Sequence, residues 1–292
     1  MNVSQTTCVY LDKFSLEEIV DIFKDAGFEA IDFSFCIKKF YGEETDSEKF
    51  KEKMLKLKNY AQSKGLYFNQ AHAPIPSSYA NDEKTEERFW DIVRSVRNSS
   101  YLGINTIVVH PKQHLEYRLE GNKEKLFQEN MEFYKRLEPY CKKYNVKVAI
   151  ENLWQEYYHC GGMTPMPSPC SDAKEHLKYL ETLNSKWFVA CLDVGHSMLT
   201  KRDPVDSIYA LGKKYLKVLH IHDVNGLNDT HTIPFHGGMG EWDKITKALS
   251  KIKYDGDFTM EIGSFINELP RELVPVGSKM VYEVGKYLSN KI

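Results

Sequence analysis

Short apolar runs and amphipathic helix patterns alternate along the whole of this 292-residue chain. Eight runs have the length and apolar content of buried strands, at residues 6–11, 30–35, 66–71, 105–110, 147–152, 187–193, 217–221 and 258–262. Helix patterns fill the intervals: one begins at Ser15 and stops at Gly27, others span 47–64, 82–102, 123–144, 171–183 and 203–215, one begins near Trp242, and the last spans 271–289. Strands that each lead through a helix to the next strand predict parallel pairing with right-handed crossovers. The predicted fold class is therefore α/β, a single (β/α)8 TIM barrel.

The chain is predicted to form one domain over residues 1–292. Its 42% hydrophobic content can bury a large core, and a barrel of this kind needs about 250 residues. No low-complexity run or Pro/Gly-rich linker divides the chain. The most irregular stretch, residues 159–169 (HCGGMTPMPSP), is expected to be a loop between a strand and a helix and is a candidate lid.

Histidines and carboxylates stand at the ends of six of the eight predicted strands. They are His72, His110, Glu151, Asp193, His220 and Glu261. In parallel barrels the reacting groups come from the carboxyl ends of the strands and from the loops that follow them. Apolar residues or Ser and Thr would serve the core equally well at these positions, so the pattern indicates a metal or acid/base site.

The stretch 216–243 has the highest density of such groups. Side chains two apart in a strand share a face, so His220 and His222 are expected to point the same way, with Asp223 just beyond the strand. Asp229, His231 and His236 follow in the loop. The alternative interpretation is a histidine-rich surface loop.

Two of the strand-end residues are glutamates in apolar surroundings. Glu151 follows the apolar run at 148–150, and Glu261 follows Phe-Thr-Met. Burial would raise the pKa of a lone carboxylate at either place unless a cation offset the burial. Pairing with a distant Lys or Arg is one way to supply that cation. The other is a divalent ion such as Mn²⁺, Co²⁺ or Zn²⁺, for which Glu151, Asp193, His220 and Glu261 form a suitable set of ligands.

Composition limits the partners and the compartment. The balance of 39 basic to 41 acidic residues argues against nucleic acid as the main partner. Six cysteines without a C-x-x-C pair are typical of reduced, mostly buried thiols in an intracellular protein. The first residues lack a signal-peptide pattern, and no apolar segment reaches the ~18 residues of a membrane helix. We expect a soluble, cytoplasmic protein with no membrane partner, for which a homo-oligomer is open.

The motifs, taken in order, resemble those of the xylose isomerase-like barrels over nearly the whole chain. They are HAP from His72, VVHP around His110, EN from Glu151, LDVGH ending at His196, HIHD over 220–223, D-x-H over 229–231, and Glu261. That superfamily holds sugar-phosphate isomerases, ketose 3-epimerases, inosose dehydratases and endonuclease IV. Ligands of the isomerase and epimerase branch are Glu, Asp, His and Glu, which match Glu151, Asp193, His220 and Glu261. His220 is preferred to His222 because the family pattern is His-x-x-Asp/Glu.

The resemblance also leaves an alternative open. Endonuclease IV binds three zinc ions through nine ligands, and each ligand has a like residue in this chain. Beyond the four above, these candidates for additional metal or substrate contacts are His72, His110, His196, Asp229 and His231. The acidic net charge and the lack of basic loops argue against the nuclease. The arginine that ketose 3-epimerases carry soon after the ligand histidine is missing, so the resemblance does not assign the substrate.

The expected function is metal-dependent isomerisation or epimerisation of a sugar, sugar phosphate or inosose. Glu151 and Glu261 would be the catalytic residues that transfer a proton through a metal-stabilised enediolate. Candidate substrate-binding residues are Glu156, which the resemblance places at a substrate-contacting position, with His196, His222 and Trp154, and Phe35 and Trp242 are further candidates for an apolar contact. A dehydratase on the same scaffold is an alternative. A non-enzymatic sugar-binding module is disfavoured because both bases and every ligand are present. No organic cofactor is expected.

Overall fold

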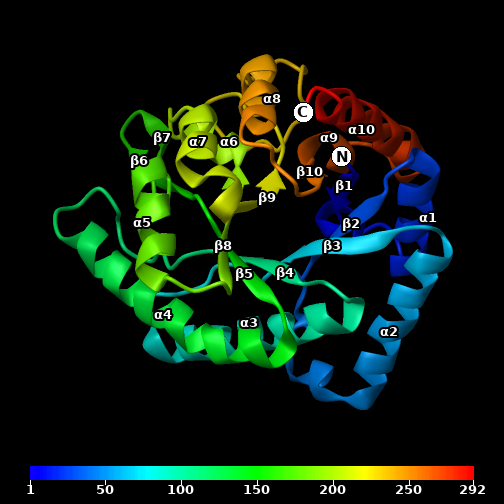
Figure 1. The fold of residues 1–292 in the computed structure, drawn as a ribbon, viewed down its shortest axis with the longest axis horizontal. Coiled ribbons are helices and arrows are strands. Elements are labelled where there is room, and N and C mark those ends of the chain that lie inside the picture. The colour runs from blue at the N-terminus through cyan, green and yellow to red at the C-terminus, as the bar shows by residue number, and fades with distance from the viewer.

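A computed structural model describes residues 1–292 and shows a barrel of eight parallel strands inside a ring of helices (Figure 1). The strands are β1 (Val3–Thr6), β2 (Ala30–Ser34), β3 (Tyr67–His72), β4 (Thr106–Val109), β5 (Lys147–Glu151), β8 (Phe188–Asp193), β9 (Leu216–His220) and β10 (Phe258–Met260). They pair in the order β10-β1-β2-β3-β4-β5-β8-β9. A parallel bridge between Ile221 and Met260 joins the two outer strands and closes the barrel. The predicted (β/α)8 barrel is confirmed.

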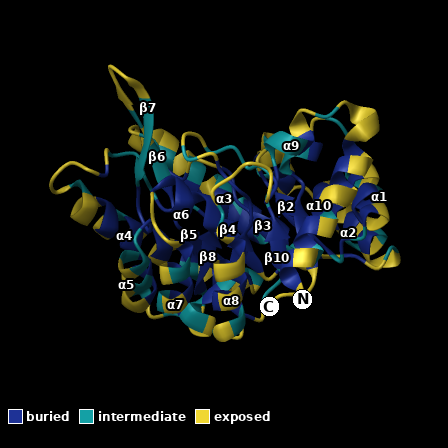
Figure 2. Ribbon diagram, turned by 90° about the horizontal axis from the view of Figure 1, so that it is seen from above, coloured by how far each residue is buried: buried dark blue, intermediate teal, exposed yellow.

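Helices cover the outside of the barrel. They are α1 (Leu16–Ala26), α2 (Glu48–Ser63), α3 (Asp82–Leu102), α4 (Asn122–Tyr144), α5 (Ala173–Leu183), α7 (Pro204–Tyr215), α8 (Trp242–Lys251) and α10 (Val274–Ser289). Two short helices, α6 (Val194–Leu199) and α9 (Ser264–Asn267), lie in the loops after β8 and β10. Burial follows this arrangement, with buried residues in the strands and on the inner helix faces and exposed residues around the rim (Figure 2). No helix combines the length and apolar character that crossing a bilayer requires.

Local sequence fixes where each helix starts and stops, as α1 shows. The Ser15 side chain accepts a hydrogen bond from the Glu18 amide, and Glu18 in turn accepts one from the Ser15 amide. This reciprocal pair caps the first turn. At the other end Gly27 adopts φ 107°, a left-handed conformation that a residue with a Cβ would strain to reach.

The first strand lies earlier than predicted. It spans Val3–Thr6, whereas the apolar part of the predicted 6–11 strand forms a short 3-10 helix at Cys8–Tyr10. Ser4 and Gln5 are polar but fully buried, and their partners lie on or beside β10. The Ser4 hydroxyl is 2.8 Å from that of Thr259, and the Gln5 amide donates to the Ile262 carbonyl. Partners distant in sequence make this polar strand stable, so its own apolar content could not reveal it.

The irregular stretch at 159–169 is largely an antiparallel hairpin rather than a loop. Strand β6 (Trp154–His159) pairs along its whole length with β7 (Gly162–Pro167). The hairpin stands out from the barrel on the side of the carboxyl ends of the strands, while both termini lie close together at the opposite end (Figure 2). It therefore forms part of the wall above the strand ends.

Candidate metal centre

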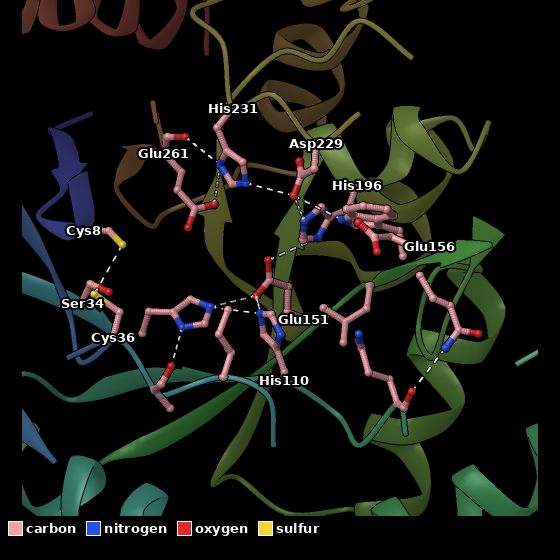
Figure 3. Close-up of a pocket in the computed structure, with 17 residues that line it drawn as sticks. Cys8, Ser34, Cys36, His110, Glu151, Glu156, His196, Asp229, His231 and Glu261 are labelled. Atoms are coloured by element: carbon pink, nitrogen blue, oxygen red, sulfur yellow. Dashed lines mark hydrogen bonds and ion pairs between the residues drawn. The ribbon is translucent and has the colours of Figure 1, made fainter. Parts of the chain in front are cut away.

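The polar strand ends surround one open cavity of about 510 Å³ (Figure 3). Its lining includes Glu151 and Glu261, His72 and His110, His196, Asp229 and His231, with Trp154 and Glu156 from the β6–β7 hairpin. Three groups of side chains here place one ligand atom from each member within 4.8 Å of the others. They are called below the central group (Glu151, Asp193, His220, Glu261), the His72 group (His72, His110, Glu151) and the Asp229 group (His196, His222, Asp229, His231).

The central group brings together the four residues expected to bind the first metal. The Nδ1 atom of His220 lies 3.2 Å from Glu151 Oε1, 3.3 Å from Glu261 Oε2 and 4.0 Å from Asp193 Oδ2. Asp193 and His220 are fully buried, whereas Glu261 retains 17% exposure. Three carboxylates and one imidazole nitrogen converging on a small volume are a donor set that Mn²⁺, Co²⁺ or Zn²⁺ can use.

A residue that the sequence analysis missed, Asp32, lies behind this group. It comes from β2, is fully buried, and both of its carboxylate oxygens lack a hydrogen-bond partner. Its Oδ2 is 3.8 Å from His220 Nε2, which also lacks a partner. Burial raises the pKa of Asp32 to about 6. A charged residue within the apolar run Ala-Ile-Asp-Phe was the signal that could have identified it.

The His72 group shares Glu151 with the central group. Glu151 Oε2 lies 3.4 Å from His72 Nε2 and 2.9 Å from His110 Nε2, yet makes no hydrogen bond of acceptable geometry. His72 Nδ1 is 2.7 Å from the Ala73 carbonyl. Because a carbonyl can only accept, Nδ1 carries the hydrogen, and a neutral His72 presents the Nε2 lone pair to the cavity.

The Asp229 group is built in the same way on the other side of the cavity. Asp229 Oδ2 lies 3.2 Å from His196 Nε2 and 3.0 Å from His231 Nε2. The Nδ1 atoms of these two histidines face the carbonyls of Asn152 and Glu261, at 2.9 and 3.0 Å. Each ring therefore donates through Nδ1 and directs Nε2 at Asp229.

The charges of the three groups support one another. Burial alone would raise the pKa of Glu151, but His220 and His110 outweigh it and hold that pKa well below the usual value. Burial would lower the pKa values of His220 and His196, but the surrounding acidic groups raise both well above the usual value. The same balance, set mainly by Asp229, raises the pKa of His231 to about 10. Both glutamates make their ion pairs with histidines only, so pairing with Lys or Arg is wrong.

The candidate substrate residues divide into two sets. Trp154, Glu156 and His196 line the cavity, and the Trp154 indole donates to Asp229 Oδ2 at 3.2 Å. His222 is fully buried and outside the lining, because its Nε2 lies 2.9 Å from Asp193 Oδ2 and its ring stacks on His231 at 3.9 Å between centroids. A substrate cannot reach it there, so we reassign His222 as a partner of Asp193.

The two further aromatic candidates lie in the core. Phe35 is fully buried against Phe33, with 4.9 Å between ring centroids. The Trp242 indole donates to Asp223 Oδ2 at 3.0 Å. Asp223 Oδ1 also accepts from the amides of three loop residues, Val224, Met239 and Gly240. Asp223 therefore holds the 224–240 loop in place, and the Trp242 ring does not line the cavity.

The fold and its strand-end groups define a parallel barrel with a candidate metal centre at the carboxyl ends. The chain matches the xylose isomerase-like TIM barrel family over residues 20–275, and it belongs to that family. The resemblance inferred from the motifs is confirmed.

Individual relatives are more distant. An uncharacterised protein of Sinorhizobium fredii is 29% identical over 142 residues, which are 47% of this chain and 40% of that protein. A candidate L-ribulose-5-phosphate 3-epimerase of Haemophilus influenzae, SgbU, is 24% identical over 223 residues, 74% of this chain and 72% of that protein. The first match thus spans less than half the length of the relative.

Solved structures of sugar epimerases and related proteins share the fold. The IolI protein with a bound zinc atom superposes with a TM-score of 0.77, at 16% identity, over 98% of this chain and 99% of IolI. The D-psicose 3-epimerase of Clostridium cellulolyticum H10, solved with D-tagatose, gives 0.75 at 15% identity over 99% of both chains. At such identities the superpositions establish the fold.

Proposed function

We propose that this protein is a metal-dependent isomerase or epimerase of a carbohydrate. One observation carries the proposal: within the central group only Glu151 and Glu261 line the cavity, while Asp193 and His220 lie buried beneath them. The two carboxylates can thus reach both a metal ion and a substrate. Carboxylates with access to a substrate carbon are the groups that proton transfer next to a carbonyl requires.

The central group fits a divalent ion. Glu151, Asp193, His220 and Glu261 would hold the ion, and the unpartnered Oε2 of Glu151 is a free donor at the edge of the group. A bound Mn²⁺, Co²⁺ or Zn²⁺ would polarise the substrate carbonyl and stabilise the enediolate that follows proton removal.

The two glutamates would do the proton transfer. Their oxygens lie 3.2 Å and 3.3 Å from the same nitrogen, His220 Nδ1, so they flank a common point. One would remove the proton from the carbon next to the carbonyl, and the other would return a proton. Return to the same carbon from the other face gives an epimer, whereas return to the neighbouring carbon gives an isomer.

The cavity favours an uncharged substrate. None of its lining residues is Lys or Arg, the side chains that usually bind phosphate. Gln113, Gln155, Glu156 and His196 offer partners for hydroxyl groups, and Trp154 offers a face for a ring. We therefore propose a free ketose, aldose or inosose, in contrast to the phosphorylated sugar in the name of the Haemophilus relative.

Solvent labelling tests the reaction. Purified protein loaded with Mn²⁺, Co²⁺ or Zn²⁺ would be screened with ketoses, aldoses and inososes in deuterated water. We expect deuterium at the carbon next to the carbonyl, read by NMR. Glu151→Gln and Glu261→Gln should each slow the exchange about a hundredfold or more, because an amide cannot accept the proton.

Glu156→Gln is the matched control, since it lines the same cavity outside the three groups. It should retain the exchange chemistry and change mainly KM. Turnover without solvent label, and without slowing when that C–H is deuterated, would contradict the proposal and indicate hydride shift or hydrolysis. A product that has lost water would assign the protein to the dehydratases.

A multi-zinc phosphodiesterase is a second candidate, because the His72 and Asp229 groups flank the central group. Three equivalents of zinc per chain, together with cleavage of abasic-site DNA, would favour it. One equivalent at saturation would leave the flanking residues as substrate contacts. The lack of basic side chains in the cavity ranks this candidate second.

A further inference from the structure

Two thiols face each other at the rim of the cavity, away from the three groups. The Sγ atoms of Cys8 and Cys36 are 3.4 Å apart (Figure 3). Cys8 follows β1 and Cys36 follows β2, and these neighbouring parallel strands pair through Thr6 and Asp32. Both cysteines line the cavity, and Cys36 is exposed.

The surroundings hold this pair in place on both sides. The Thr7 amide donates to the Asp32 carbonyl, and the Thr7 hydroxyl accepts from the Ser34 amide, each at 2.9 Å. These bonds tie together the two segments that carry the thiols. A disulfide needs its sulfurs about 2.05 Å apart, so rotation of the side chains with small loop shifts would have to bring them closer.

We propose that Cys8 and Cys36 are a reversible dithiol–disulfide site at the cavity rim, oxidised by peroxides. Cys36 is the attacking sulfur because it is the more exposed. Its thiolate attacks one peroxide oxygen, the O–O bond breaks, and hydroxide leaves to take up a proton as water. The resulting sulfenic acid is attacked by the Cys8 sulfur, which loses its proton, and the S–O bond breaks with release of a second water. Two thiols and one hydrogen peroxide thus give one disulfide and two waters.

Electrostatics agree with this direction of attack. The Cys8 thiol donates to the Cys36 sulfur, which is the main reason that the pKa of Cys36 is lowered to about 6 and that of Cys8 is raised. Thiolates are the nucleophilic form of cysteine. The disulfide would join the β1–α1 and β2–α2 loops, and would fix the wall of the cavity opposite Glu156 (Figure 3).

Thiol counting tests the site in the whole protein. The chain has six free cysteines, of which Cys141, Cys170 and Cys191 are buried. Cys160 is the other exposed thiol, so the Cys160→Ser variant removes its reactions. Hydrogen peroxide at low excess should lower the number of thiols alkylated after denaturation by two, and dithiothreitol should restore them. Peptide mass spectrometry should find Cys8 linked to Cys36, with the protein lighter by two hydrogens.

Single variants provide the control. In Cys8→Ser, peroxide should add oxygen to Cys36 without any disulfide within the chain, and Cys36→Ser should react more slowly. Circular dichroism would establish that each variant is folded. The proposal is overturned if peroxide converts Cys36 of the otherwise native chain to the sulfinic acid with no linked peptide. It is also overturned if the Cys8→Ser chain loses two thiols as readily as the parent.

Discussion

The central group and the Asp229 group differ in how the chain supports them. The side chains of the central group come from the ends of β5, β8 and β9 and from the residue after β10. In the Asp229 group His196 lies on α6, while Asp229 and His231 lie on the loop after β9 and are 17% and 26% exposed. Strand ends are fixed by the hydrogen bonds of the barrel, whereas the loop is held by a few side chains. We infer that the central group is the primary metal site and that the Asp229 group adapts to substrate.

The largest expected difference is in bound metal. His220→Ala removes the nitrogen around which the central group is built, so the purified variant should lose its metal. His231→Ala removes one nitrogen of the Asp229 group and should retain at least one equivalent. Elemental analysis after saturation and desalting measures both. If His231→Ala emptied the protein while His220→Ala remained loaded, the order of the two groups would be reversed.

Asp32 gives a sharper test of the central group. Its carboxylate is positioned to accept a proton from His220 Nε2, which leaves the Nδ1 lone pair directed at the glutamates. Carboxylates behind ligand histidines typically change metal affinity by about 10- to 100-fold. Asp32→Asn should weaken metal binding by about that factor, measured as Kd by calorimetry.

Asp229→Asn, the same chemical change in the other group, is the control for Asp32→Asn. It should leave the tightest metal site unchanged. Thermal unfolding of the metal-free proteins separates binding from folding. An unchanged Kd in Asp32→Asn would show that His220 is oriented without Asp32.

The pH dependence of metal affinity should also differ between the groups. His220 is the only histidine of the central group, and its pKa is raised well above the usual value. In the Asp229 group the pKa of His196 is likewise raised and that of His231 reaches about 10. A metal must displace each of these protons, and every displaced proton changes affinity about tenfold per pH unit. Between pH 6 and 8 affinity should therefore rise about tenfold per unit at the central group and about a hundredfold per unit at the Asp229 group.

Without metal the sign is opposite. Because the folded-state pKa of His231 is raised, its ion pair with Asp229 stabilises the fold fully below pH 6.5 and is lost as the pH rises through about 10. Chemical unfolding of wild type and His231→Ala at several pH values measures this contribution. Equal metal-affinity slopes for the two groups, or no loss of the His231 contribution toward pH 10, would contradict the assigned charges.

The sequence predicted what repeats along the chain. The alternation of strands and helices is fixed by local periodicity, and the six polar strand ends meet because parallel strands end at one side of a barrel. Asp32 was missed because its role depends on His220, which lies on a strand distant in sequence. His222 was misassigned for a related reason. Two-residue spacing predicts a shared face with His220 but does not predict that Asp193 and His231 will enclose the ring.

The hairpin was missed because its strands carry little apolar signal. Gly161, Gly162, Pro165 and Pro167 suggested an irregular loop, yet β6 and β7 pair over their full lengths. Such strands are stabilised by each other rather than by the core, so neither apolar content nor alternation marks them. The same holds for Ser4 and Gln5 in β1, whose partners come from the far end of the chain.

The smallest expected effect concerns the support of the loop that carries Asp229. In Asp223→Asn the remaining carbonyl oxygen can still accept the three loop amides, but the new amide faces the Trp242 indole, so two donors meet. A buried donor without an acceptor costs about 1–3 kcal/mol. We expect a loss of unfolding free energy of about that size, measured in urea, while metal affinity at the central group stays within about twofold. Trp242→Phe is the matched change, because it removes the opposing donor. If Asp223→Asn weakened the central group as strongly as Asp32→Asn, the loop would support both groups, and the distinction between strand-borne and loop-borne ligands would fail.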